Sequence, residues 1–303
     1  MSTALVQRHD RRRFVKAVSA GVGGLILWPA CLRAGSRQRE AVRFIVISDT
    51  HVGYHGQDRA AGLWEKTAAE IADAEGDVVI HLGDIVDGKR EDQYPIYLAA
   101  RRRIGKPVHE VPGNHDPAEL FRKHVREKVD TVVDHRWLRF VLVNNTRTDS
   151  HDGFLSDEQI EWIDRQCRDA AGRDLLVTLC MHVPVHKNLH PDRGWYVKPE
   201  DGQTKLYETI RKHRDRVLAL LHGHFHNGIR GWDDHPPVHE ICFPSALYNL
   251  NRRLEEQGAP GYNPLEFRPG YTLVRVAGTT MQLRYKPLGE EVAVEKSLEL
   301  LKG

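Results

Sequence analysis

Polar side chains suited to binding metal ions follow five separate apolar runs in this chain, and this pattern constrains the fold more than any other feature. The five segments are Asp49-Thr50-His51, Gly83-Asp84-Ile85-Val86-Asp87, Gly113-Asn114-His115-Asp116, Met181-His182-Val183-Pro184 and Gly223-His224-Phe225-His226. Together they offer enough carboxylate, carboxamide and imidazole donors for two metal ions, with one carboxylate left to bridge them. Donors of this kind, without thiolate, suit Mn, Fe or Zn rather than a structural zinc site built on cysteine. Two such ions side by side would serve the hydrolysis of phosphate esters.

The apolar runs predict alternating strands and helices. Strands that end at or near a polar segment are expected over residues 42–47, 78–82, 107–111, 175–181 and 217–221, with others over 139–143, 238–243, 271–276 and 281–285. Helices are expected over 58–75 and 92–104, after Pro117, and from Ser156, where Gln159 completes a capping box. The last two strands are expected to be antiparallel because Ala277–Thr280 is a short link. The alternation indicates an α/β fold, with the candidate ligands gathered at the carboxyl ends of the strands.

The composition is that of an ordinary globular chain, with 40% hydrophobic and 28% charged residues over 303 positions. The net charge of +2 hides an uneven distribution, because residues 1–40 carry eight basic and two acidic residues and the remainder is mildly acidic. This distribution gives no sign of the basic stripe that is typical of nucleic-acid-binding proteins. The four cysteines have no zinc-knuckle or disulfide spacing, and Cys167, Cys180 and Cys242 are interpreted as buried free thiols. One domain over residues 41–303 is the simplest organisation.

Residues 1–40 resemble a twin-arginine signal peptide. Arg11 and Arg12 precede Phe14, and a weakly hydrophobic stretch of small residues follows from Ala17 to Ala30. That stretch is too short for an ordinary transmembrane helix. We therefore expect export through the twin-arginine machinery to the periplasm or another extracytoplasmic location. Cys31 is a candidate lipid-anchor site, although plain cleavage between residues 30 and 40 fits the preceding residues better.

The order of the five segments resembles the calcineurin-like metallophosphoesterase superfamily, and in particular its compact bacterial members. In one-letter form the order reads D-x-H, G-D-x-x-D, G-N-H-D, H-x-P and G-H-x-H. The resemblance implies a two-sheet mixed β-sandwich flanked by helices, with a dimetal site at the C-terminal ends of the strands. It also implies an enzyme that hydrolyses a phosphate ester, either a phosphodiester or a phosphomonoester, by means of a hydroxide that bridges the metal ions.

The same resemblance assigns roles to individual residues. Two divalent ions (Mn, Fe or Zn) are expected to share Asp84, and the remaining ligands would be Asp49, His51 and His226 for one ion and Asn114, His182 and His224 for the other. His115 is expected to donate a proton to the leaving oxygen or to stabilise charge on the phosphoryl oxygens. Asp116 is a candidate to orient His115, and Asp87 is a candidate partner of a ligand.

Three further expectations concern the surroundings and the reaction. The loop that contains His186, His190 and Trp195 is a candidate wall of the substrate site, and residues 245–270, with Tyr248, are a candidate lid. Two alternatives to a general phosphoesterase stay open: a cyclic-nucleotide phosphodiesterase, and a metal-binding protein on the same fold without turnover. The predicted export argues against intracellular signalling, and the complete set of seven ligands argues against a loss of catalysis.

Overall fold

The computed structural model describes residues 39–300, apart from residues 188–193, 228–229, 233–237 and 251–255. Residues 38–303 cluster as one compact unit. Residues 1–38 of the predicted signal peptide, with Cys31, and also His190 lie outside the described residues. None of the described helices is both long enough and apolar enough to cross a bilayer.

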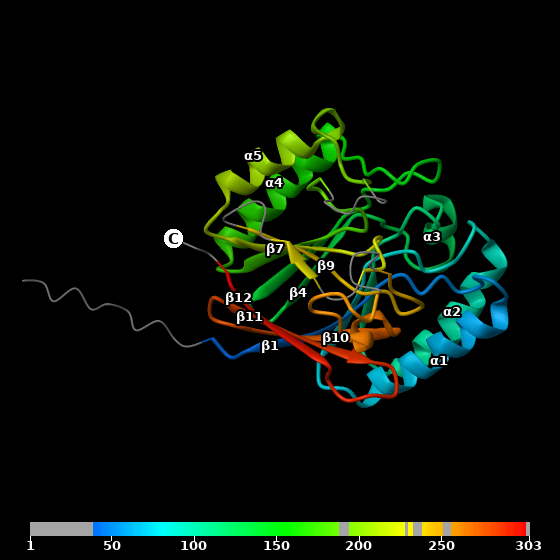
Figure 1. Cartoon of the computed structure of the whole chain (residues 1–303). Helices are drawn as coiled ribbons and strands as arrows, with labels where there is room; N and C mark the ends of the chain where they lie inside the picture. Colours follow the sequence, from blue (N-terminus) through cyan, green and yellow to red (C-terminus); the bar gives the residue numbers. More distant parts are fainter. Residues whose placement is uncertain (1–38, 188–193, 228–229, 233–237, 251–255, 301–303) are drawn as a thin grey trace, which may run out of the picture. The chain divides into compact units, whose positions relative to one another are not determined.

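The described strands form two six-stranded mixed sheets (Figure 1). The order across the first sheet is β12 (Val294–Glu299), β11 (Thr280–Pro287), β10 (Gly270–Ala277), β1 (Val42–Ile47), β2 (Val78–His81) and β3 (Val108–Glu110). The order across the second is β4 (Thr131–His135), β5 (Leu138–Leu142), β6 (Leu176–Cys180), β7 (Val217–His222), β9 (His239–Cys242) and β8 (Arg230–Trp232). β1, β2 and β3 run parallel, as do β5, β6, β7 and β9. Parallel runs in each sheet therefore bring several strand carboxyl ends to one edge.

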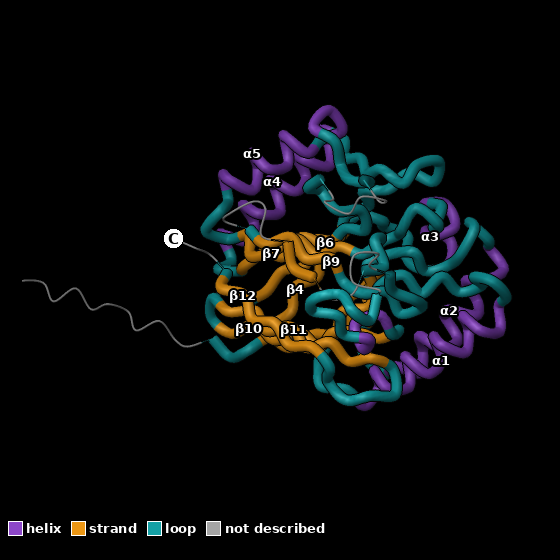
Figure 2. Tube along the Cα trace, in the orientation of Figure 1, coloured by secondary structure: helices purple, strands orange, loops and turns teal. Residues whose placement is uncertain are grey.

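Helices cover the outer face of each sheet (Figures 1 and 2). The first sheet carries α1 (Gln57–Asp73) and α2 (Tyr94–Arg101), with α3 (Ala118–His124) beside them, and the second carries α4 (Asp157–Gly172) and α5 (Gln203–Lys212). Successive side chains of β1 point to opposite faces of the sheet, so this strand packs both against the other sheet and against the helices. Phe44 packs against Phe140 in the core between the sheets, with ring centroids 4.9 Å apart. Ile45 and Ile47 point the other way and pack with Trp64 of α1.

These features confirm the predicted fold class and most of the predicted elements. The Ser156–Gln159 capping box is formed, β10 and β11 make the predicted antiparallel pair, and the three described cysteines are buried free thiols. The predicted helix over 92–104 is instead α2 flanked by two 3-10 turns, Glu91–Gln93 and Arg102–Ile104. Among the described residues, the elements that the sequence patterns did not reveal are β4, β8, β12, α5 and the 3-10 helices Pro199–Asp201 and Pro264–Phe267.

Candidate metal centre

The five polar segments come together at the carboxyl ends of five strands. Residues 49–51 follow β1, residues 83–87 follow β2, residues 113–116 follow β3, residues 181–184 follow β6 and residues 223–226 follow β7. Backbone hydrogen bonds join neighbouring segments: Asp49 N–H donates to Gly83 O at 2.9 Å, and His51 N–H donates to Asp84 O at 2.9 Å. The site therefore combines strands of both sheets.

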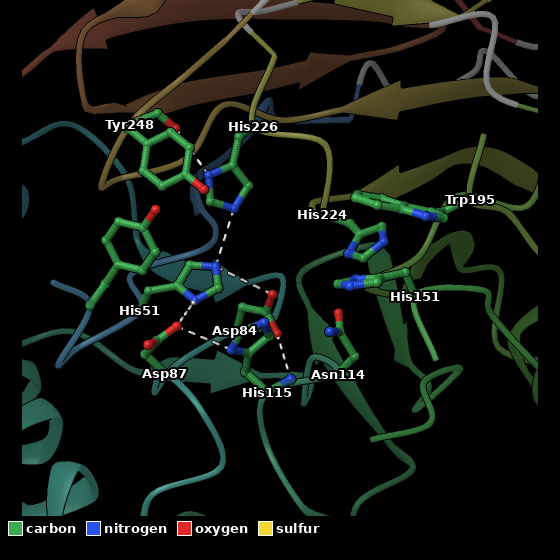
Figure 3. A pocket seen from close by; sticks show the side chains of 11 residues that line it. His51, Asp84, Asp87, Asn114, His115, His151, Trp195, His224, His226 and Tyr248 are labelled. Atoms are coloured by element: carbon green, nitrogen blue, oxygen red, sulfur yellow. Dashed lines mark hydrogen bonds and ion pairs between the residues drawn. The ribbon is translucent and has the colours of Figure 1, made fainter. Parts of the chain in front are cut away.

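The candidate ligands form clusters in which one donor atom from each residue lies within 4.8 Å of the others. One cluster contains Asp49, His51 and His226, and another contains Asp84, His182 and His224. Asp84 also belongs to a third cluster, with His51 and His115. Figure 3 shows Asp84 between the side chains of His51 and Asn114, with His226 on the side of His51 and His224 on the side of Asn114.

Asp84 is the residue that joins the two clusters. Its Oδ2 atom lies 3.3 Å from His51 Nε2 and 3.2 Å from His182 Nε2, while its Oδ1 accepts the His115 N–H at 2.9 Å. Asp49 contacts the His224–His226 segment: its Oδ1 lies 3.0 Å from His226 Nε2, and its carboxylate accepts the His224 N–H. The geometry is what a carboxylate shared between two cations requires.

Three imidazoles are oriented by contacts at their outer nitrogen. His182 Nδ1 lies 2.7 Å from Leu82 O, and His226 Nδ1 lies 3.1 Å from Tyr248 O. A nitrogen facing a carbonyl oxygen must carry the proton, so Nε2 of each ring keeps its lone pair free for a cation. His51 Nδ1 faces Asp87 Oδ1 at 3.2 Å and turns its Nε2 inward in the same way. Such partners commonly orient the histidine ligands of metal sites.

Two buried donor atoms in the site lack any hydrogen-bond partner, namely Asn114 Oδ1 and His224 Nε2. An unpaired buried polar atom costs free energy, and native proteins seldom keep one without a reason. A cation next to the Asn114 oxygen would satisfy it, and carboxamide oxygen beside carboxylate and imidazole is a suitable donor set for Mn, Fe or Zn. The residues present therefore fit the predicted metals.

The backbone at the site is strained in a consistent way. Five of the seven candidate ligands have positive φ angles: Asp49 (54°), His51 (40°), Asp84 (53°), His224 (74°) and His226 (51°). This left-handed region is sparsely populated by residues other than glycine, and such strain is concentrated at functional sites. The strand-to-loop transitions thus turn these five side chains toward one small volume.

The surroundings lower the pKa values of Asp84 and Asp49 and raise the pKa of His115. Burial alone would raise the pKa of Asp84, but the charges of His182 and His51 outweigh it and hold the pKa well below its usual range. The same competition, chiefly between burial and His226, lowers the pKa of Asp49. For His115, burial lowers the pKa, but the hydrogen bond to Asp87 and the charge of Asp84 prevail, so the pKa is raised. His115 is therefore suited to carry a proton near neutral pH.

Asp87 and Asp116 turn out to have different contacts. Asp87 Oδ1 lies 3.2 Å from Nδ1 of both His51 and His115, so it contacts a candidate ligand as expected. Asp116 was expected to orient His115, and this expectation is wrong. Its buried carboxylate instead accepts backbone N–H groups of Gly113, Ile85 and Val86. Asp116 thus ties the third segment to the second.

Aromatic residues from outside the five segments surround the centre. Tyr54, His151, Trp195 and Tyr248 line the pocket above the candidate ligands. Trp195 and Tyr248 belong to the predicted wall and lid, whereas His151 carried no signal, because its loop between β5 and α4 lacks a motif. His186, by contrast, is buried against Glu240, 2.7 Å from its carboxylate, and does not line the pocket.

Comparisons with known proteins agree with this geometry. A family model described as calcineurin-like phosphoesterase matches residues 42–228. The chain belongs to this family. It is therefore a hydrolase that acts on phosphate esters, and the predicted resemblance and enzyme class are confirmed.

Relatives and solved structures add detail. A probable cyclic nucleotide phosphodiesterase from Rhodococcus erythropolis is 26% identical over 288 residues, which cover 90% of this chain and 92% of the relative. A probable glycerophosphodiester phosphodiesterase from Arcobacter nitrofigilis is 26% identical over 159 residues, or 50% of this chain, so the chain spans only 56% of that relative. A dimetal phosphatase from Danio rerio has the same fold, with a TM-score of 0.64 at 15% identity over 86% of this chain and 99% of that one.

Proposed function

We propose that this chain hydrolyses phosphodiesters with the help of two divalent metal ions, Mn, Fe or Zn. The observation that carries the proposal is the position of Asp84 Oδ2, within 3.3 Å of His51 Nε2 and 3.2 Å of His182 Nε2. One carboxylate oxygen thus faces both clusters of donors. Two cations in these positions would polarise the phosphoryl oxygens and lower the pKa of a water molecule.

The chain's own residues hold and complete the centre. Asp49, His51 and His226 would bind one ion, and Asn114, His182 and His224 the other, with Asp84 shared. His115 is not among these ligands in our proposal, although its ring nitrogen lies near His51 and Asp84. Its raised pKa suits a proton donor, and Nε2 is the atom from which a leaving oxygen would take the proton.

The charge of the pocket lining favours a phosphodiester over a phosphomonoester as the substrate. Among the residues that the structure describes, those lining the pocket include no lysine or arginine. A phosphodiester carries one negative charge, whereas a monoester dianion carries a second charge that a positively charged side chain would ordinarily balance. The names of the two relatives, which refer to diesters, point the same way.

A cyclic-nucleotide phosphodiesterase is the second candidate. It is favoured by the relative from Rhodococcus erythropolis, because that match extends over almost the whole length of both proteins. A non-catalytic metal-binding protein is disfavoured, since none of the seven candidate ligands is replaced.

The test is a hydrolysis panel on protein loaded separately with Mn, Fe or Zn. It compares bis(4-nitrophenyl) phosphate, 4-nitrophenyl phosphate and 3′,5′-cyclic AMP, with the Asp84→Asn variant as the control. We expect a higher kcat/KM for the diester than for the monoester, and near-complete loss of activity and of both metals in the variant. Faster turnover of the monoester would overturn the diesterase proposal, and two full metal ions in Asp84→Asn would overturn the shared carboxylate.

We also propose export of the protein by the twin-arginine route, with residues 1–40 as the signal and residues 41–303 as the mature phosphoesterase domain. The paired Arg11 and Arg12 and the short apolar stretch support this proposal. Fractionation of cells that express the full chain, or an Arg11→Lys, Arg12→Lys double variant, tests it. Normal export of the double variant would refute the route, and metabolic labelling with a fatty acid would reveal an anchor on Cys31.

A further inference from the structure

Two aromatic side chains are stacked face to face at the edge of the candidate metal centre. The rings of Trp195 and His151 are stacked, with centroids 4.3 Å apart and planes inclined by 20°. Trp195 lies 5.2 Å, centroid to centroid, from His224, which is a candidate ligand (Figure 3). His151 is exposed and Trp195 is partly exposed, yet both line the pocket. Exposed, stacked rings beside a reaction centre call for a functional explanation.

Hydrogen bonds between the two loops hold this pair in place. Tyr196 N–H donates to Asp152 Oδ1 at 3.4 Å, Gly153 N–H donates to Tyr196 O at 3.3 Å, and Lys198 Nζ pairs with Asp152 Oδ2 at 2.7 Å. The second loop is in turn fixed to the fourth polar segment, since Val197 N–H donates to Pro184 O at 2.9 Å. The stacked pair is therefore preorganised relative to the metal centre, which lowers the entropic cost of binding a ligand there.

The size of the pocket shows where the rest of a substrate must lie. Its volume is about 110 Å³, smaller than the roughly 300–1,000 Å³ of pockets that enclose a whole small molecule. The phosphoryl group would fill it, so the ester substituents would extend over the rim. On the side of His224 the described part of that rim contains Trp195 and His151 (Figure 3).

We infer that the stacked pair of Trp195 and His151 offers one of its outer ring faces as a stacking subsite for a planar, uncharged substituent of the phosphodiester, such as a nucleobase or an aryl ring. This inference rests on the proposed function and narrows its substrate class. Stacking of a base on an aromatic side chain contributes about 1–3 kcal/mol, which corresponds to roughly 5- to 150-fold in kcat/KM or affinity. An aliphatic substituent would gain little from the same surface.

The experiment compares two diesters with the same leaving group and the same charge, thymidine 5′-(4-nitrophenyl phosphate) and ethyl 4-nitrophenyl phosphate. The readout is the ratio of their kcat/KM values on the metal-loaded protein. We expect the wild-type ratio to favour the thymidine ester, to fall roughly 5- to 150-fold in Trp195→Leu, and to be largely kept in Trp195→Phe. The matched control is Tyr196→Leu, which removes the neighbouring aromatic ring outside the pocket lining and should keep the ratio.

Calorimetry provides a second readout that does not depend on turnover. The affinity of thymidine 5′-monophosphate relative to ethyl phosphate should fall in Trp195→Leu and in His151→Ala. If Trp195→Leu does not fold, as judged by circular dichroism, His151→Ala decides the matter. Unchanged ratios in folded Trp195→Leu or His151→Ala, while both diesters are still hydrolysed, would overturn the subsite and leave the proposed function standing. Failure of the wild type to hydrolyse either diester would instead overturn the proposed function.

Discussion

Gly113 lies so close to Asp84 that a single methyl group should disable the metal centre. A Cβ atom added to Gly113 would lie 2.1 Å from Asp84 Oδ1 and 2.2 Å from Asp84 N, where ordinary contacts begin at 3.4 Å. One of these atoms belongs to the backbone, so a change of rotamer cannot relieve the overlap. Asp84 would have to retreat by more than about 1 Å, and a displacement of that size typically costs about 10²-fold in rate. We expect Gly113→Ala to lose at least that factor in kcat/KM.

The matched control is the same substitution in open space. Gly62 lies within α1, and a Cβ atom added there would meet nothing within 4 Å. Alanine is the better helix former, so Gly62→Ala should raise the free energy of unfolding by about 0.5–1 kcal/mol and leave activity unchanged. Both variants are assayed for bound metal by mass spectrometry, for diester hydrolysis and for urea unfolding. A Gly113→Ala protein with two full metals and the wild-type rate would refute the reasoning.

Three other predictions follow from the contacts of single side chains. Removing the contact between Asp87 and His51 with Asp87→Ala should weaken metal binding at the site that includes His51 by about 10–100-fold, and equal affinities by dialysis would contradict this. His115→Ala should retain both metals but lose more rate on an alkyl ester than on a nitrophenyl ester, within the 10²–10⁴-fold range of general acid catalysis; equal losses would indicate charge stabilisation instead. Burial and the charge of Arg126 lower the pKa of His109 to about 4 in the folded protein. In the unfolded chain the pKa of this histidine is near 6.5, so as the pH falls the unfolded chain takes up the proton first. The free energy of unfolding should therefore fall between about pH 6.5 and 4. His109→Gln should make that fall smaller in urea titrations, and an identical pH profile would exclude His109 as its source.

The positions of most strands, and the polar segments that follow them, were predictable because local sequence patterns determine them. Buried runs such as residues 42–47 and 217–221 lack polar interruptions, and each ends at a polar segment. The capping box at Ser156 is likewise a local interaction and formed as predicted. Helix α5 was missed because only Leu206 and Ile210 mark its buried face, which is too short a pattern to distinguish from a loop.

The surroundings of the site depend on tertiary contacts that no local pattern encodes. His151 meets Trp195 because contacts such as the Tyr196 N–H to Asp152 and the Lys198 Nζ to Asp152 join two loops about 44 residues apart in the sequence. Asp116 was misread for a related reason. Its position next to His115 suggested contact, but the turn sends its carboxylate to the N–H groups of the preceding segment, where burial and the charge of Asp84 raise its pKa to about 6.

These contacts explain how so many charged and polar donors can be packed into one place. The segments are joined by backbone hydrogen bonds, such as Asp49 N–H to Gly83 O and Gly223 N–H to His182 O, and by the carboxylate of Asp116. The strain of the left-handed residues is balanced by this frame and by the ligands themselves, since Asp49 accepts the His224 N–H and Asp84 Oδ1 accepts the His115 N–H. A site built in this way keeps its shape whatever its loops bind, so the surrounding loops, with Trp195 among them, can differ between relatives without disturbing the chemistry.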